Sequence, residues 1–223
     1  MIRKATYEDL PVLMEIFRNA RGIMRSSGNL HQWNDGYPSE EIVRQDIDAG
    51  HCVVLCRQGR VIATMAFIPG PDPTYARIYD GKWLSDSPYH VIHRIAVSEP
   101  GHNAARTLLD WAFEHSSSIR IDTHRDNVIM HHVLSGYGFV HCGTILLSNG
   151  DPREAYQMVR EDASLSMSSS VVDLPVTNRT VLSVSPRGPH ISKLTFSLRR
   201  SITGLGCVKN CWLVGESIAA LKP

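Results

Sequence analysis

Residues 122–139 read DTHRDNVIMHHVLSGYGF, and this segment decides the fold. It begins at the end of a strand that the alternating pattern of SIRIDT predicts over 118–123, and Asn127 then opens a helix that closes on Gly138. A strand that passes through a short polar turn into a helix is the repeating unit of α/β proteins. The segment therefore predicts a polar cluster at the end of a sheet strand, where loops often carry function.

The pattern on either side of this segment continues the alternation of strands and helices. From the N-terminus the sequence predicts a strand over 2–5, a helix from Tyr7 to the mid-twenties, a second helix over 40–50, and a hairpin over 51–68 that turns at Gln58 and Gly59. A surface loop over 69–88 follows, then a strand over 89–97 and a helix over 104–115. After the strand over 118–123 and the helix that Asn127 opens, the sequence predicts two more strands, over 139–147 and 153–159. This order favours an α/β sheet of mixed direction over a helix bundle or a sandwich.

Beyond residue 160 the composition changes to Ser, Thr and Pro with little periodic apolar content. About 60 residues of this kind make a weak hydrophobic core. We therefore predict one folded domain over 1–160 and a loosely ordered Ser/Thr/Pro-rich extension over 161–223.

Composition narrows the classes of function. The chain has 223 residues, 43% of them hydrophobic, and a net charge of +1, which gives no broad basic field for a nucleic-acid or membrane partner. No apolar stretch approaches the length of a membrane span and the N-terminus has no apolar signal region, so we expect a cytoplasmic protein. The five cysteines are odd in number and are interpreted as mostly reduced thiols.

The second informative segment is the strand VIHRIAV (91–97), which runs through the loop SEPGHNAA (98–105) into a helix. The first backbone N–H groups of a helix have no partner within it, and together with the helix dipole they hold phosphate groups. Small residues let the backbone approach such a ligand. Gly and Ala are also commonplace between a strand and a helix, so an ordinary connection is the alternative.

The two segments together resemble those of the GNAT acyltransferases, which use acetyl-CoA to acetylate amines. In that family an Arg/Gln-x-x-Gly-x-Gly/Ala loop cradles the pyrophosphate of CoA, and an Asn-x-x-Ala-x-x-Leu-Tyr-x-x-x-Gly-Phe segment flanks the pantetheine. The second pattern is matched at Asn127, Met130, Val133, Leu134, Gly138 and Phe139. The opening IRKATYEDLPVLMEIF is also similar to the family's first strand and helix, so the resemblance covers roughly residues 1–160.

The resemblance implies an α/β (α+β) fold, with a GNAT-like mixed central β-sheet flanked by helices on both faces. It also implies an N-acetyltransferase that moves the acetyl group of acetyl-CoA to a primary amine by direct attack in a ternary complex. The residues implied in coenzyme binding are Ile95, Ala96, Val97, Gly101, Asn103, Ala104, Ala105, Arg106 and Asn127.

Two positions depart from the family pattern. The loop lacks the basic residue or glutamine at its start, and Leu134 occupies the position where many members carry a tyrosine general acid. Protonation of the leaving thiolate must therefore come from another group or from water, with Tyr137 and His132 as remote candidates for the acid.

A general base near neutral pH is most simply a histidine. His93 lies two residues before Ile95 on the same face of its strand, and His124 ends the neighbouring strand, so these two are the candidate catalytic residues. As alternatives, His93 is a hydrogen-bonded strand residue, His124 belongs to a helix cap with Arg125 and Asp126, and Asn127 is only an N-cap.

The acceptor amine is expected to bind between two Gly- and Pro-broken segments, 29–38 and 72–86. The predicted apolar walls are Trp33, Tyr37, Tyr79 and Trp83, and the predicted attractors of a cationic amine are Asp35, Asp80 and Asp86. Ordinary aromatic packing is the alternative for each aromatic residue taken singly.

The competing functions are a non-catalytic acyl-CoA-binding regulatory module and an interaction protein that works through residues 161–223. A small-molecule amine is the expected partner, and a homodimer is a further expectation. No metal is predicted, because the adjacent His131 and His132 point in different directions and CVKNC at 207–211 has no second pair.

Overall fold

The structure is a computed structural model that describes residues 1–98 and 103–160. Its strands are β1 (Ile2–Lys4), β2 (Cys52–Arg57), β3 (Arg60–Pro69), β4 (His90–Val97), β5 (Ser118–Thr123), β6 (Val140–Leu146) and β7 (Pro152–Val159). Its helices are α1 (Leu10–Ser26), α2 (Glu40–Asp48), α3 (Ala104–His115) and α4 (Val128–Tyr137), with short 3-10 turns η1 (Tyr7–Asp9), η2 (Asn34–Gly36) and η3 (Pro73–Tyr75). The predicted order of strands and helices is confirmed over this part of the chain.

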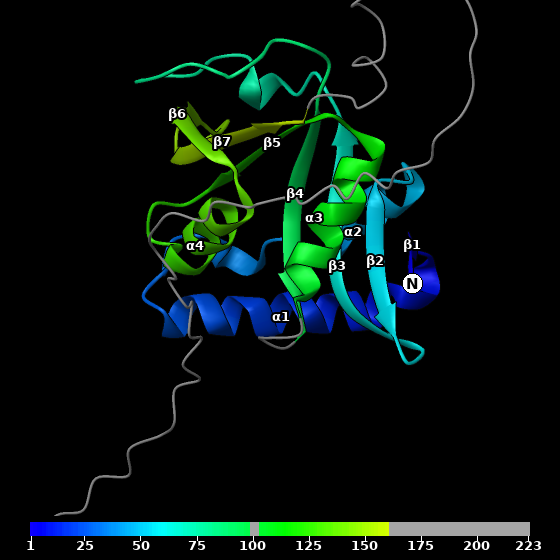
Figure 1. Ribbon diagram of the computed structural model, residues 1–223. Coiled ribbons are helices and arrows are strands. Elements are labelled where there is room, and N and C mark those ends of the chain that lie inside the picture. The colour runs from blue at the N-terminus through cyan, green and yellow to red at the C-terminus, as the bar shows by residue number, and fades with distance from the viewer. Residues whose placement is uncertain (99–102, 161–223) are drawn as a thin grey trace, which may run out of the picture. The chain divides into compact units, whose positions relative to one another are not determined.

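The seven strands form one mixed sheet in the order β1-β2-β3-β4-β5-β7-β6. Only β4 and β5 pair in parallel, and every other neighbouring pair is antiparallel. The parallel pair is connected through α3, as a parallel connection requires a crossover. In Figure 1, α3 lies alongside β3 and β4, and α4 lies on the side of β5 and β6.

Helices cover both faces of the sheet, which confirms the predicted fold class. Alternation along β2 divides the core, because Val53 and Leu55 pack in the cluster with α3 and α4, whereas Val54 packs in the cluster with α1 and α2. A third cluster, centred on Tyr75, Val91 and Ile145, packs the loop 70–89 against β6 and β7, which are called the C-terminal strands below. Each layer thus buries its apolar face against the sheet.

The start of α1 is fixed by a buried carboxylate. Asp9 accepts hydrogen bonds from the Arg3 guanidinium at 2.6 and 2.8 Å and from the backbone N–H of Thr6 at 2.8 Å. The hydrogen bond from Arg3 lowers the pKa of Asp9 most strongly. Strand β1 and the first helix are therefore tied together by charge as well as by packing.

The loop 70–89 joins the far strands through backbone contact. Tyr79 forms an isolated antiparallel bridge with Thr144 of β6. A side chain at Gly81 would place its Cβ 1.9 Å from the carbonyl oxygen of Cys142, and one at Gly143 would meet the carbonyl oxygen of Tyr79 at 2.5 Å. Glycine is required at both positions because two backbones touch there.

The expectations about membrane spans and about cysteines concern the whole chain, whereas the structure describes only part of it. Within it no helix is both long and apolar enough to cross a membrane. Cys52, Cys56 and Cys142 are free thiols. The predicted extension over 161–223, with Cys207 and Cys211, lies outside the described residues.

Candidate active site

The site begins where β4 and β5 separate. Their parallel pairing covers only His90–Ile119, Val91–Arg120 and Ile92–Ile121, although β4 continues to Val97. Within the described residues, positions 93–97 pair with β3 alone, so their other edge has no strand partner. Backbone N–H and C=O groups on an open edge seek partners, and a ligand can supply them.

A bulge in β4 sharpens the separation. The register with β3 shifts between Thr64 and Ala66, and Arg94 adopts a left-handed φ of 55° at this point. The Arg94 side chain then points toward α2, where it donates to both carboxylate oxygens of Asp46 at 2.7 and 2.8 Å. It also donates to the Tyr37 hydroxyl at 2.9 Å. Bulges of this kind re-aim neighbouring side chains.

A cleft of about 530 Å³ occupies the space between the separated strands. Residues 92–97 of β4 and Ile121, Asp122 and Thr123 of β5 form its two sides. The end of α1 with the segment 31–37 closes one end, α4 and Ala105 line another part, and the turn from Leu147 to Arg153 contributes the remainder.

His93 enters this cleft between two carboxylates. Its Nε2 lies 3.0 Å from Asp72 Oδ2, and its Nδ1 lies 3.9 Å from Asp122 Oδ1. The buried Tyr75 donates its hydroxyl to Asp122 Oδ1 at 2.5 Å and sets its ring edge-on to the imidazole. The histidine is therefore held through Nε2 and by the ring of Tyr75 rather than lying free in a strand.

Asp72 is held for this contact by its own turn. Its Oδ1 accepts the backbone N–H of Thr74 at 2.8 Å, which caps η3, and its backbone N–H donates to the Tyr89 hydroxyl at 3.3 Å. The pKa of Asp72 is lowered, first by the hydrogen bond from His93. An ionised carboxylate only accepts, so His93 carries its proton on Nε2 and presents the Nδ1 lone pair toward Asp122.

His124 is placed differently. Its side chain is 11% exposed and is not among the residues that line the cleft, whereas the neighbouring ring of His31, tilted against it at 5.9 Å, is. Nδ1 accepts the backbone N–H of Asp126 at 3.2 Å, as in the predicted cap alternative. Burial lowers the pKa of His124, and the charge of Arg153 lowers it further.

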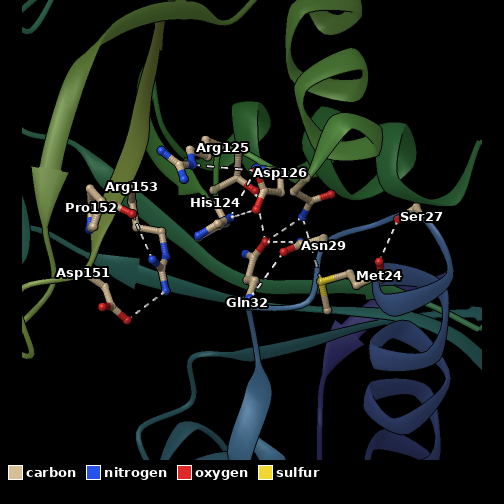
Figure 2. A network of polar contacts seen from close by, with 12 residues as sticks. Met24, Ser27, Asn29, Gln32, His124, Arg125, Asp126, Asp151, Pro152 and Arg153 are labelled. Atoms are coloured by element: carbon tan, nitrogen blue, oxygen red, sulfur yellow. Dashed lines mark hydrogen bonds and ion pairs between the residues drawn. The ribbon is translucent and has the colours of Figure 1, made fainter.

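Asn127 lines the cleft, and both polar atoms of its side chain are engaged. Oδ1 caps α4 by accepting the N–H of Met130 at 3.1 Å, and Nδ2 donates to Gln32 Oε1 at 2.9 Å. This contact joins the turn before α4 to the segment after α1, where Figure 2 shows Asn29 and Gln32 side by side. Asn127 is therefore the N-cap of α4, and it also contacts Gln32.

The structure describes the start of α3 from Asn103 onward. Asn103 adopts a left-handed φ of 51°, a conformation that Asn tolerates better than most residues. Ala104 is buried, and Ala105 lines the cleft. Arg106 is exposed and lies over the Tyr137 ring at 5.3 Å, away from the cleft lining. Gly101 lies outside the described residues.

The predicted amine-binding residues divide into two groups. Trp33 and Tyr37 line the cleft. Tyr79 and Trp83 do not, because the loop 70–89 turns them toward the C-terminal strands, where Trp83 stacks on Tyr75 and covers Arg120 at 4.1 Å. The aspartates Asp35, Asp80 and Asp86 are likewise absent from the lining.

The predicted substitutes for a tyrosine acid lie outside the cleft lining as well. Leu134 is fully buried in the core under α3. Tyr137 donates to Asp110 at 2.7 Å, and burial raises its pKa to about 12. His132 is exposed and lies 2.9 Å from the carbonyl of Val128.

Among the polar residues that sequence reasoning missed are Gln32, Asp122 and Arg153 of the cleft lining, together with Asp72, which contacts His93 but does not itself line the cleft. Asp122 lies two residues before His124, within the segment 122–139. Because side chains alternate along a strand, its position predicts that it faces the side of the sheet opposite Ile121. Asp72 lies in a Pro-flanked loop, and its partner His93 is 21 residues away. No local signal connects the two.

Comparison with known proteins gives consistent results. The model of the acetyltransferase (GNAT) family matches residues 13–139. A GNAT-family acetyltransferase from Streptococcus agalactiae is 35% identical, with a TM-score of 0.68 over 73% of this chain and 96% of its own. No match to a curated protein reaches significance.

Two more distant structures share the fold. A GNAT-family acetyltransferase from Listeria monocytogenes is 20% identical, with a TM-score of 0.55 over 71% of this chain and 94% of its own. The ribosomal-protein-alanine N-acetyltransferase from Brucella melitensis is 21% identical, with a TM-score of 0.51 over 71% of this chain and 99% of its own.

Proposed function

Because this chain belongs to the GNAT family of acetyltransferases, whose members generally use acetyl-CoA, we propose that it acetylates a primary amine by direct attack within a ternary complex. The observation that carries the proposal is His93, which stands in the cleft at the point where β4 leaves β5, with its Nε2 hydrogen-bonded to Asp72. A base placed at that point reaches an amine that approaches a thioester held along 93–97.

The open edge of β4 supports coenzyme binding. Positions 95–97 line the cleft and have no partner on the side of β5 among the described residues, which leaves backbone groups for an amide-rich pantetheine chain. Asn103, Ala104 and Ala105 let the chain approach a pyrophosphate closely at the start of α3. Asn127 contributes by anchoring α4, since its own amide is already satisfied.

The chemistry assigned to the side chains is proton removal. The Asp122 carboxylate attracts the ammonium form of the acceptor, and the Nδ1 lone pair of His93 takes one proton from it. The neutral nitrogen forms a bond to the acetyl carbon and the carbon–sulfur bond breaks. The second proton of the nitrogen then passes through water to the departing thiolate, which leaves the amide and the free thiol. Asp72 stabilises the imidazolium that forms on His93. No covalent enzyme intermediate is needed.

The test uses the full chain and begins with calorimetric titration of acetyl-CoA and desulfo-CoA. Binding is expected for both, and its absence would remove the proposal. Thiol release with a panel of primary amines then distinguishes an enzyme from an acyl-CoA-binding module. Loss of a positioned base typically costs about 10²- to 10⁴-fold, so His93→Ala should lower kcat by that order.

His124→Ala serves as the comparison in the same assay, because His124 is buried beside the cleft rather than within its lining. We expect a smaller loss of kcat for it than for His93→Ala. The reverse ranking would transfer the role of base to His124.

A further inference from the structure

Arg153 is a buried cation with few partners. Its side chain is 9% exposed, and it lines the cleft. A guanidinium has five N–H donors, yet within the described residues it makes one hydrogen bond, to the carbonyl of Pro152 at 2.9 Å. Asp151 Oδ2 lies 4.0 Å away, beyond hydrogen-bonding distance, on a side chain that is 55% exposed. The remaining N–H groups of Arg153 have no hydrogen-bond partner among the described residues, and a ligand in the cleft can accept from them.

Gln32 presents a second group that only donates. The orientation of its side-chain amide follows from two neighbouring asparagines. Asn127 Oδ1 accepts the backbone N–H of Met130, and Asn29 Oδ1 accepts the backbone N–H of Gln32 itself. Both asparagines must then donate through Nδ2, at 2.9 Å each, to the same atom of Gln32, which is therefore Oε1. Gln32 Nε2 is left facing the cleft with no partner in the part of the chain that the structure describes.

Both donors line the cleft. Figure 2 shows Gln32 and Arg153 reaching into the same region from the segment after α1 and from β7, with His124 and Asp151 beside them. His124 adds no second positive charge there at neutral pH, because burial and the charge of Arg153 lower its pKa. The negative groups Asp72 and Asp122 lie instead at His93.

We propose that the acceptor is an amine that also carries a carboxylate, a free amino acid, with its ammonium group at His93 and Asp122 and its carboxylate at Arg153 and Gln32. This rests on the proposed acetyl transfer. The cleft would then hold a zwitterion with each pole against the opposite charge. A planar carboxylate matches the fork of a guanidinium and accepts an amide N–H alongside it, so both unused donors become satisfied.

The decisive experiment measures binding separately from turnover. Each standard amino acid and its carboxamide are titrated calorimetrically into the full chain saturated with desulfo-CoA, since the amide keeps the shape and removes the charge. A hydrogen-bonded charge is worth a preference of about 10- to 100-fold, and we expect that preference for the acid in the amino acids that bind. Equal affinity for acid and amide, or no binding by any acid, overturns the inference.

Two variants assign the preference to its residues. Arg153→Gln should remove it, and Arg153→Lys should retain part of it. Gln32→Glu is a closely matched change, because a carboxylate keeps the acceptor used by Asn29 and Asn127 and replaces only the donor Nε2. It should abolish binding of the acid and spare the amide. Persistence of the acid preference in both Arg153→Gln and Gln32→Glu contradicts the assignment. Desulfo-CoA affinity reports whether each variant is folded.

Thiol release with the same compounds separates the two proposals. If acids bind selectively but no thiol appears with any amine, the acetyl transfer is wrong and the carboxylate site stands. If thiol is released equally with amino acids and with their decarboxylated amines, the transfer stands and the carboxylate site is wrong. Preference for aminoalkylphosphonates over amino acids would make the anion a phosphate-like group and would also overturn the inference.

Discussion

Asp72 decides which nitrogen of His93 faces the cleft. Replacing its charge should therefore weaken the base without weakening the coenzyme site. We predict that Asp72→Asn lowers kcat about 10- to 100-fold and leaves KM for acetyl-CoA nearly unchanged. Steady-state kinetics of the full chain measures both values. Asp86→Asn is the matched control, since its side chain is fully exposed in the same loop. A fall in kcat/KM that comes only from KM would show that Asp72 acts on binding.

For His124 the prediction concerns the pKa of the side chain rather than the rate of the reaction. Its pKa is lowered first by burial and then by the Arg153 charge, with His31 and Arg125 adding to the effect and Asp126 opposing it. The imidazole resonance should titrate below the ordinary midpoint of about 6.5, and Arg153→Gln should raise that midpoint. Two-dimensional NMR follows the ring protons, and His124→Gln assigns them.

The same shift has a consequence for stability. The folded pKa of His124 lies below the unfolded one, so the unfolded chain binds a proton first as pH falls. His124 therefore costs no stability at pH 8 and lowers the free energy of unfolding as pH drops through the ordinary histidine range. A midpoint at or above 6.5 in the folded protein would contradict this account.

At the scale of elements, the bulge of β4 depends on α2. Arg94 and Asp46 are 11% and 12% exposed and are joined by two hydrogen bonds. Removing one member of a buried pair costs about 3–5 kcal/mol, so Arg94→Ala should lower the free energy of unfolding by about that amount. Arg44→Ala, which breaks an exposed pair with Glu40 on the same helix, should cost under about 0.5 kcal/mol.

Chemical denaturation compares the two variants, and a double-mutant cycle with Asp46→Ala tests the coupling. Because the double variant leaves no unpaired charge, it should be less destabilised than the two single changes predict together. Simple additivity would mean that the pair does not hold the bulge.

The elements themselves were largely readable from the sequence. Apolar periodicity in 10–24 and the Gln58-Gly59 turn act over a few residues, so α1 and the β2–β3 hairpin follow from local patterns. The placement of side chains around the cleft was less accessible. Trp83 met the local criteria for a pocket wall, yet it covers Arg120 because its loop docks on β6. Such docking depends on contacts between distant segments, which no short window contains.

At the scale of the whole molecule, the contact between the loop 70–89 and β6 holds the loop that carries Asp72, the partner of His93, against the edge strand β6. Gly81→Ala places a methyl group against the carbonyl of Cys142, and Gly143→Ala combines a similar clash with a φ of 138°. Each should destabilise the protein by about 2 kcal/mol or more. Since the same loop carries Asp72, kcat should fall in both variants.

Gly22→Ala is the control for these changes, because it lies within α1 with nothing within 4 Å of the added methyl group. It should raise the free energy of unfolding by about 0.5–1 kcal/mol. Thermal and urea unfolding measure all three variants. If Gly81→Ala unfolds like the wild type, the loop is not held by backbone contact with β6.

The short pairing of β4 with β5 makes the cleft a wedge whose apex is only three residue pairs long. Val97 lies five residues beyond Ile92, or about 16 Å at the rise of an extended strand. A rotation of one degree at the apex thus displaces Val97 by about 0.3 Å, and binding geometries tolerate about 0.5 Å. A change in packing at Ile92 or Ile121 therefore shifts backbone atoms near Val97 that neither side chain contacts. Conservative substitutions at these two positions should change the width of the cleft between β4 and β5.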